Sequence, residues 1–182
     1  MKIIWAAFTL VITLAACDSR QPNDGGPNSD AIDANNPLDV AARDAHLIDD
    51  PGTTVPMGLY EREGAAGTDG LCLAGQDDAM RFGVVMHFGP TLICEGSGTA
   101  QHDGATIALR FDNADCQIDV AYDGRILRIP GAVPQGCDAV CGERASMAGG
   151  ILNRVGWSNA EALQLNSRRD VLQNKPVRAL CH

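Results

Sequence analysis

The sequence predicts an all-β fold: a small antiparallel β-barrel of about seven or eight strands that is cross-linked by disulfides. A long loop and room for a short helix are expected near the C-terminus. Three observations support this fold class. Asp-Gly dipeptides, which suit two-residue hairpin turns, recur at residues 69–70, 103–104 and 123–124. Around them, apolar and polar residues alternate with the period of two of a half-buried strand. Six cysteines lie in the same part of the chain, and an even number favours a disulfide framework.

Residues 1–16 have the anatomy of a secretory signal peptide. Lys2 precedes an apolar run that is broken only by Thr9 and Thr13, is too short for a comfortable membrane span and ends in small residues. The run closes on Leu14-Ala15-Ala16-Cys17, which resembles the lipobox of bacterial lipoproteins.

The lipobox resemblance implies that Cys17 is the membrane anchor. In lipoproteins this cysteine carries fatty acyl chains such as palmitate and becomes the first residue after cleavage, and two or more chains give lasting attachment. The protein is then expected in the cell envelope, facing the periplasm. Asp18 resembles the inner-membrane retention signal of enteric bacteria, which other bacteria do not obey, so both membranes stay open. The alternative is an ordinary cleaved signal with a chance cysteine.

Charge and cysteine usage narrow the classes of partner. Removal of residues 1–16 takes away Lys2, so Lys+Arg falls from 14 to 13 against 23 Asp+Glu, and the net charge becomes −10. This balance argues against nucleic acid and against adhesion to anionic lipid by charge, and it suits a basic partner, although acidity is more often a means of solubility. Zinc and other cofactors are not expected, because no Cys-x-x-Cys pair occurs. The cysteines that remain after Cys17 predict three disulfides in an exported chain and are Cys72, Cys94, Cys116, Cys137, Cys141 and Cys181.

Residues 17–54 are rich in Asp, Asn, Pro and Gly and lack aromatic residues. They predict a lipidated, disordered tether, because too little apolar surface is available to offset the entropy of ordering. A calcium loop is the alternative, but its spaced Asp pattern is absent. Residues 55–182 then form the barrel domain.

The Asp123-Gly124 turn predicts the clearest hairpin. A two-residue loop there pairs Tyr122 with Arg125 and Asp119 with Arg128 across the strands. The buried face would carry Ile118, Val120, Tyr122, Leu127 and Ile129.

The Asp103-Gly104 turn predicts a second hairpin. It sets Ala105, Ile107, Leu109 and Phe111 against His102, Ala100, Gly98 and Gly96 in turn. Further strands are expected at Arg81–Phe88, Thr91–Glu95 and Ile151–Trp157, with opening strands around Tyr60 and Leu71–Leu73. Residues 135–150 read as a loop with a helical turn near residues 138–141. Ser158 could cap a short helix, although the same residues could serve as strand.

Three stretches resemble the membrane-bound inhibitors of c-type lysozyme. Val120–Ile129 resembles the family's Tyr-Asp hairpin, Gly142–Ser146 its Ser-Gly-x-Arg loop, and Trp157-Ser158 with the later Glu161-Ala162 and Arg168-Arg169-Asp170 its C-terminal end. The resemblance covers residues 116–181 at most. It implies a small antiparallel barrel on an envelope lipoprotein, and inhibition of lysozyme.

The resemblance also bears on individual residues. It implies a disulfide between Cys72 and Cys181. The family's loop serine corresponds to Cys141, and its lysine after Trp-Ser corresponds to Asn159. These are the residues that family members insert into the lysozyme active site.

The other cysteine pairs are inferred from the strands. Cys94 and Cys116 share the inward parity of strands expected to be neighbours and form the second expected pair. Cys137–Cys141 remains by elimination.

Catalysis is the weaker functional hypothesis, and the protein is not expected to be an enzyme. Ser158 lies in Gly-Trp-Ser-Asn-Ala, near the nucleophile-elbow pattern, but the only later histidine is His182. His87 could act as an acid or base, although it falls in an apolar strand. A small periplasmic hydrolase that uses Ser158 or His87 is therefore the alternative.

A binding module of the envelope is the leading hypothesis. The 135–150 loop carries Glu143, Arg144 and Ser146 beside two cysteines, and a braced loop on a rigid barrel loses little entropy on binding. The expected partner is a basic protein such as lysozyme, or a cell-wall component. A structural envelope lipoprotein without chemistry is the remaining alternative, in which the loop only plugs the barrel end.

Overall fold

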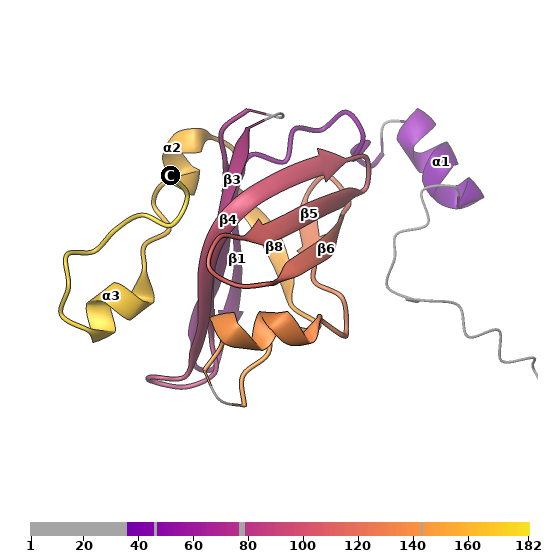
Figure 1. Cartoon of the computed structure of the whole chain (residues 1–182). Coiled ribbons are helices and arrows are strands. Elements are labelled where there is room, and N and C mark those ends of the chain that lie inside the picture. Colours follow the sequence, from indigo (N-terminus) through magenta and orange to yellow (C-terminus); the bar gives the residue numbers. More distant parts are fainter. Residues whose placement is uncertain (1–35, 46, 77–78, 143) are drawn as a thin grey trace, which may run out of the picture.

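The computed structural model describes residues 36–45, 47–76, 79–142 and 144–182. The expected signal peptide, Cys17 and Glu143 lie outside the described residues. Within these residues, eight antiparallel strands form one closed barrel, which confirms the expected fold class (Figure 1). The strands are β1 (Gly58–Gly64), β2 (Gly67–Ala74), β3 (Met80–His87), β4 (Ile93–Asp103), β5 (Thr106–Phe111), β6 (Gln117–Tyr122), β7 (Ile126–Arg128) and β8 (Ile151–Gly156).

The barrel is a simple meander. Each strand pairs with the next, and β8 pairs with β1 to close the ring. Closure gives every strand of the barrel a neighbour on each side, so no whole strand forms a sheet edge. The expected strand at Thr91–Glu95 is the first part of the long β4, which continues to Asp103.

Inward side chains fill the barrel. In β6 and β7, Ile118, Val120, Tyr122 and Leu127 are at most 2 % exposed, as the alternating pattern predicts. Aromatic rings pack within this core, and the rings of Phe82 and Phe111 meet edge to face with centroids 4.8 Å apart.

Two hairpins keep the predicted faces but differ in register. Asp103 pairs with Thr106 and Tyr122 pairs with Leu127, so Gly104 and Gly124 each take the first loop position instead of the second. The predicted pairing of Tyr122 with Arg125 is therefore wrong by two residues. Because side chains alternate with period two, a two-residue shift leaves every side chain on its face.

The third Asp-Gly dipeptide is not a turn. Asp69 and Gly70 lie inside β2, and the β1–β2 hairpin turns at residues 65–66, because Gly64 pairs with Gly67. Asp69 faces Arg62 across the pair, and a Cβ on Gly70 would lie 2.5 Å from Leu165 Cδ1. This glycine provides room for the C-terminal segment.

Short helices flank the barrel. The 3₁₀-helix η1 (Gln135–Val140), drawn in orange, lies across one end of the barrel, and α2 (Asn159–Ala162) and α3 (Arg168–Leu172) lie to one side (Figure 1). The helix α1 (Pro37–Asp44) lies on the other side, within the stretch 17–54 predicted as a disordered tether. This part of the prediction needs correction, because the Asn36 side chain accepts a hydrogen bond from the backbone of Leu38 and starts a helix with proline in its first turn.

The described residues form three disulfides. Cys72–Cys181 is the pair that the family resemblance implies. The other two pairs are Cys94–Cys141 and Cys116–Cys137, so the predicted Cys94–Cys116 and Cys137–Cys141 pairs are wrong. Strand β5 lies between β4 and the start of β6, which separates Cys94 from Cys116.

Candidate functional site

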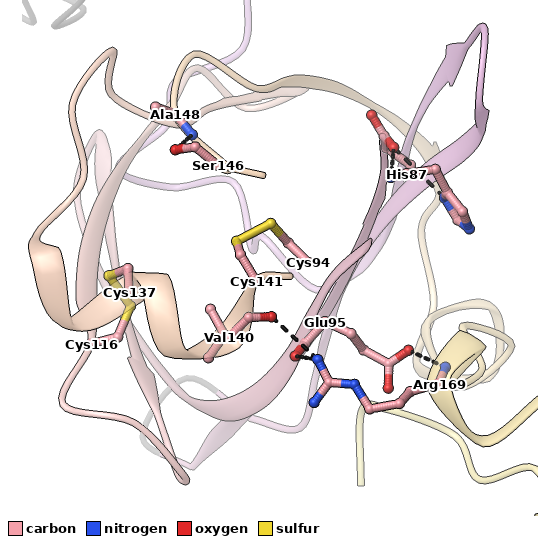
Figure 2. The surroundings of a disulfide bond; sticks show 11 residues. His87, Cys94, Glu95, Cys116, Cys137, Val140, Cys141, Ser146, Ala148 and Arg169 are labelled. Atoms are coloured by element: carbon pink, nitrogen blue, oxygen red, sulfur yellow. Dashed lines mark hydrogen bonds and ion pairs between the residues drawn. A yellow bond between two sulfur atoms is a disulfide. The ribbon is translucent and has the colours of Figure 1, made fainter. Parts of the chain in front are cut away.

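Two disulfides brace the connection between β7 and β8. Cys116–Cys137 joins the first turn of η1 to the start of β6, and Cys94–Cys141 joins the end of η1 to β4 (Figure 2). The bridge to β4 is extended by a hydrogen bond from the backbone of Gly142 to the carbonyl of Ile93 (3.0 Å). The start of the segment that follows Cys141 is therefore held in place on β4.

Residues 142–149, which we name the end loop, alternate between anchored and exposed positions. Ala145 and Met147 are 9 % and 1 % exposed and pack in the core. Arg144 and Ser146, which alternate with them along the chain, are exposed. The loop ends at Gly149, whose backbone donates to the carbonyl of Pro130 (2.9 Å). The end loop thus presents two polar side chains on buried supports.

Arg144 and Ser146, two of the three predicted binding residues, lie together on this loop. Arg144 adopts the left-handed region at φ 66°, which costs a non-glycine residue about 1 kcal/mol. Ser146 Oγ accepts a hydrogen bond from the backbone of Ala148 (3.2 Å), which orders the turn (Figure 2). Glu143, the third predicted residue, is not described.

Ser158 is a helix cap, as predicted. Its hydroxyl donates to Glu161 Oε2 (2.7 Å) and accepts from the backbone N–H of Glu161, and Glu161 accepts from the backbone of Trp157 (2.8 Å). This reciprocal capping box starts α2. The hydrogen bond from Ser158, with that from Trp157, lowers the pKa of the Glu161 carboxyl. The described hydrogen bonds of Ser158 therefore serve local structure.

His87 lies beside a buried carboxylate. Asp69, 1 % exposed, accepts from Arg62 Nε (2.9 Å) and from the backbone N–H of His87 (2.6 Å). The Nδ1 atom of His87 is 3.8 Å from Asp69 Oδ1. Figure 2 shows His87 well apart from Ser146 at the barrel end, so the structure does not bring these two side chains together.

A cluster that the sequence did not indicate closes the opposite end of the barrel. Arg154 Nη1 donates to the hydroxyl of Tyr122 (3.1 Å), and Arg154 Nη2 donates to the carbonyl oxygens of Val55 (3.0 Å) and Met57. The guanidinium also lies 3.9 Å from the ring centroid of Trp157. Arg154 lies in a strand whose more buried and more exposed positions alternate as in any half-buried strand. Its sequence context therefore does not indicate that it links several segments.

The tyrosines of this cluster are shielded from solvent. The hydroxyl of Tyr60 donates to the carbonyl of Pro56 (2.6 Å), and that of Tyr122 donates to the carbonyl of Gly124 (2.9 Å). Burial raises the pKa of Tyr60 and, against the opposing charge of Arg154, raises the pKa of Tyr122. Both tyrosines act as neutral hydrogen-bond donors that tie the chain before β1 and the β6–β7 turn to the barrel.

A cleft of about 520 Å³ lies beside this cluster. It separates the 39–51 segment from the β6–β7 turn and β8, and it is lined by charges of both signs, including Asp49, Arg125 and Arg128. Arg128 is already 3.5 Å from Asp123. The cleft therefore shows no single charge preference.

Comparison with protein-family models, curated proteins and solved structures finds no match to this chain. In the described part of the chain, no three His, Cys, Asp or Glu side chains are grouped so that they could hold a metal ion. The helices described there are also too short or too polar to cross a membrane. The three disulfides indicate an oxidising compartment outside the cytoplasm.

The end loop presents hydrogen-bonding side chains on a fixed support. Arg144 can donate several hydrogen bonds to a carboxylate in a planar fork, and Ser146 can donate and accept. Because the loop is held by a disulfide at its start and by core side chains within it, little entropy would be lost on binding.

Proposed function

We propose that this protein is an envelope-anchored lipoprotein whose barrel binds a basic protein partner through the end loop, in the manner of a c-type lysozyme inhibitor. The observation that carries the proposal is the end loop itself. Arg144 and Ser146 are exposed and alternate with the buried Ala145 and Met147, shortly after the Cys94–Cys141 disulfide.

Both the net charge of the chain and the charge of Arg144 support this choice of partner. The chain has a net charge of −9, which favours encounter with a basic protein. At the contact itself Arg144 is positive, and the active site of lysozyme carries a pair of carboxyl groups. An exposed arginine on an acidic protein complements an acidic cleft on a basic one.

The positions that the family uses have other roles here. Cys141, which corresponds to the family's loop serine, is bonded to Cys94. Asn159, which corresponds to its lysine, accepts a hydrogen bond from the backbone of Gly75 (2.8 Å). Inhibition by this chain would therefore depend on Arg144 and Ser146, with Cys17 as the lipid anchor.

The proposal is tested by titrating the full chain against c-type lysozyme at low salt. We expect inhibition that weakens as salt is added, and at least about tenfold weaker inhibition by Arg144→Ala or Ser146→Ala, since each removes a contact at the centre of the interface. Both side chains are exposed, and the exposed hydrogen bond from the backbone of Ala148 to Ser146 Oγ contributes at most about 1 kcal/mol, so the melting temperature should fall by no more than a few degrees.

Arg110→Ala is the matched control, because it removes the same charge from an exposed position on the barrel wall. Its inhibition should equal that of the wild type. The proposal fails if the wild type neither binds nor slows lysozyme, or if Arg110→Ala loses as much inhibition as Arg144→Ala.

A further inference from the structure

The C-terminal segment forms a compact surface loop with closed ends. The backbone of Ser167 donates to the carbonyl of Arg178 (2.9 Å), and that of Leu180 donates to the carbonyl of Leu165 (2.9 Å). We name residues 167–178 the basic loop. Its ends are paired, and it contains α3, so it has the form of an Ω-loop.

The basic loop is fixed to the barrel wall at both of its ends. Glu95, 3 % exposed on β4, accepts a hydrogen bond from Ser167 Oγ (2.7 Å) and one from the backbone of Arg169 (2.8 Å; Figure 2). The Cys72–Cys181 disulfide holds the chain shortly after the loop. The rest of the loop is therefore presented on a rigid base.

The charge of this loop is opposite to that of the chain. Arg168, Arg169, Lys175 and Arg178 against Asp170 give 4 − 1 = +3, in a protein of net charge −9. Only Arg178 is paired within the loop, at 3.0 Å from Asp170. The Arg168 and Lys175 side chains are exposed.

Aliphatic side chains are exposed among these basic residues. Val171, Leu172 and Val177 are 42 %, 38 % and 53 % exposed. The buried side of the loop is formed by Ser167 and Asp170, so the aliphatic residues lie on surface that the barrel does not cover. The loop combines positive charge and apolar surface without any aromatic residue.

We propose that the basic loop binds the surface of an anionic phospholipid bilayer. Lysine and arginine near such a surface are attracted to the negative lipid headgroups, and aliphatic side chains between them can enter the boundary with the acyl chains. Single-stranded nucleic acid is the poorer fit, because its binding sites stack bases on aromatic rings. The loop and α1 lie on opposite sides of the barrel, so the proposed contact is separate from α1 (Figure 1).

The test measures partition of the full chain onto vesicles of phosphatidylcholine with and without phosphatidylglycerol. All variants carry Cys17→Ser, so that no acyl chain forms, and the ratio between the two vesicle types cancels any N-terminal contribution that they share. We expect a ratio well above one that falls with salt. The double variant Arg168→Glu with Lys175→Glu should lower this ratio at least about 25-fold, because each basic residue removed should lower it about fivefold.

Arg110→Glu with Arg125→Glu is the matched control, because it makes the same change of charge at exposed barrel positions. It should keep most of the anionic preference. Val171→Ser with Leu172→Ser should weaken binding about tenfold and leave the salt dependence unchanged. Circular dichroism would verify that each variant is folded.

Two results would overturn the inference. One is an anionic preference that survives the loop variant or falls equally in the control. The other is a loop variant that loses affinity for a single-stranded oligonucleotide and keeps its vesicle binding. Neither result affects lysozyme inhibition, which depends on the end loop.

Discussion

Replacing Arg154 with alanine should loosen the end of the barrel opposite the end loop. The guanidinium joins three segments, because it donates to Tyr122 on β6 and to the carbonyls of Val55 and Met57 before β1, and it packs on Trp157 after β8. The segment before β1 should therefore detach first.

The magnitude follows from the hydrogen bonds. The guanidinium donates four described hydrogen bonds, because Nη1 also reaches the carbonyl of Gly124 (3.4 Å). A hydrogen bond to a charged group contributes about 1.5–3 kcal/mol to stability, so four bonds would give at least about 6 kcal/mol if none were replaced. Val55 is 47 % exposed, so water can hydrate the freed carbonyls and lower the loss. We expect the free energy of unfolding to fall by about 3 kcal/mol and the melting temperature by about 10 °C.

Urea unfolding under non-reducing conditions, followed by far-ultraviolet circular dichroism, measures this loss. Arg125→Ala is the control, because its guanidinium also lies over Trp157, at 5.9 Å, but is exposed. It should cost at most about 0.5 kcal/mol. A loss below about 1 kcal/mol for Arg154→Ala, or equal losses for the two variants, would refute the reasoning.

Two further predictions concern pH and the anchor. Because burial raises the pKa of Tyr60 and of Tyr122 above 10.0, the folded barrel keeps protons that the unfolded chain loses, so the stability that these tyrosines provide is complete below pH 10 and falls above it. Between pH ~9 and ~11 the free energy of unfolding should drop by up to about 1.4 kcal/mol in total for each tyrosine, and Tyr60→Phe or Tyr122→Phe should reduce that loss in unfolding curves measured over this range. A loss unchanged in both variants would contradict this. Intact-mass analysis of the exported protein should show acyl chains on Cys17 that Cys17→Ser removes, and a wild-type mass equal to that of the polypeptide alone would exclude the anchor.

The barrel strands could be predicted because the alternation of apolar and polar residues within individual strands is visible in the sequence. Alternation in β5, β6 and β7 assigns each side chain to the core or to solvent, and that assignment survives a two-residue shift of register. The register itself could not be read from the dipeptide. Asp123 accepts hydrogen bonds from the backbones of Arg125 (3.0 Å) and Ile126 (2.7 Å), so it acts as the residue before the turn and leaves Gly124 in the first loop position.

Contacts between distant segments could not be read from the sequence. In the sequence, Gly70 follows an aspartate as a turn glycine does. In the structure it lies in a strand, where the absence of a side chain makes room for Leu165. Cys94 finds Cys141 because β5 pairs only with residues 98–103 of β4 and leaves the start of that strand uncovered. The role of Arg154 depends on three segments that meet only in the closed barrel.

The end loop was predictable in part. Its polar residues beside two cysteines mark a braced segment, and Arg144 and Ser146 do lie on it, both exposed. The supports beneath them were not visible, because Ala145 and Met147 are buried by contacts with strands far away in the sequence.

The Cys72–Cys181 bond also determines how the protein would respond to mechanical force. It joins residues 109 positions apart, on the second strand and at the end of the chain. Tension applied between the N-terminal segment and the C-terminus passes directly from Cys72 to Cys181, so residues 73–180 carry no load. Only β1 and the first residues of β2 can be peeled from the barrel, and the extension stops at the sulfur–sulfur bond. A domain pulled between its N-terminal segment and its C-terminus would lengthen by little more than one hairpin while six of its strands stay in place.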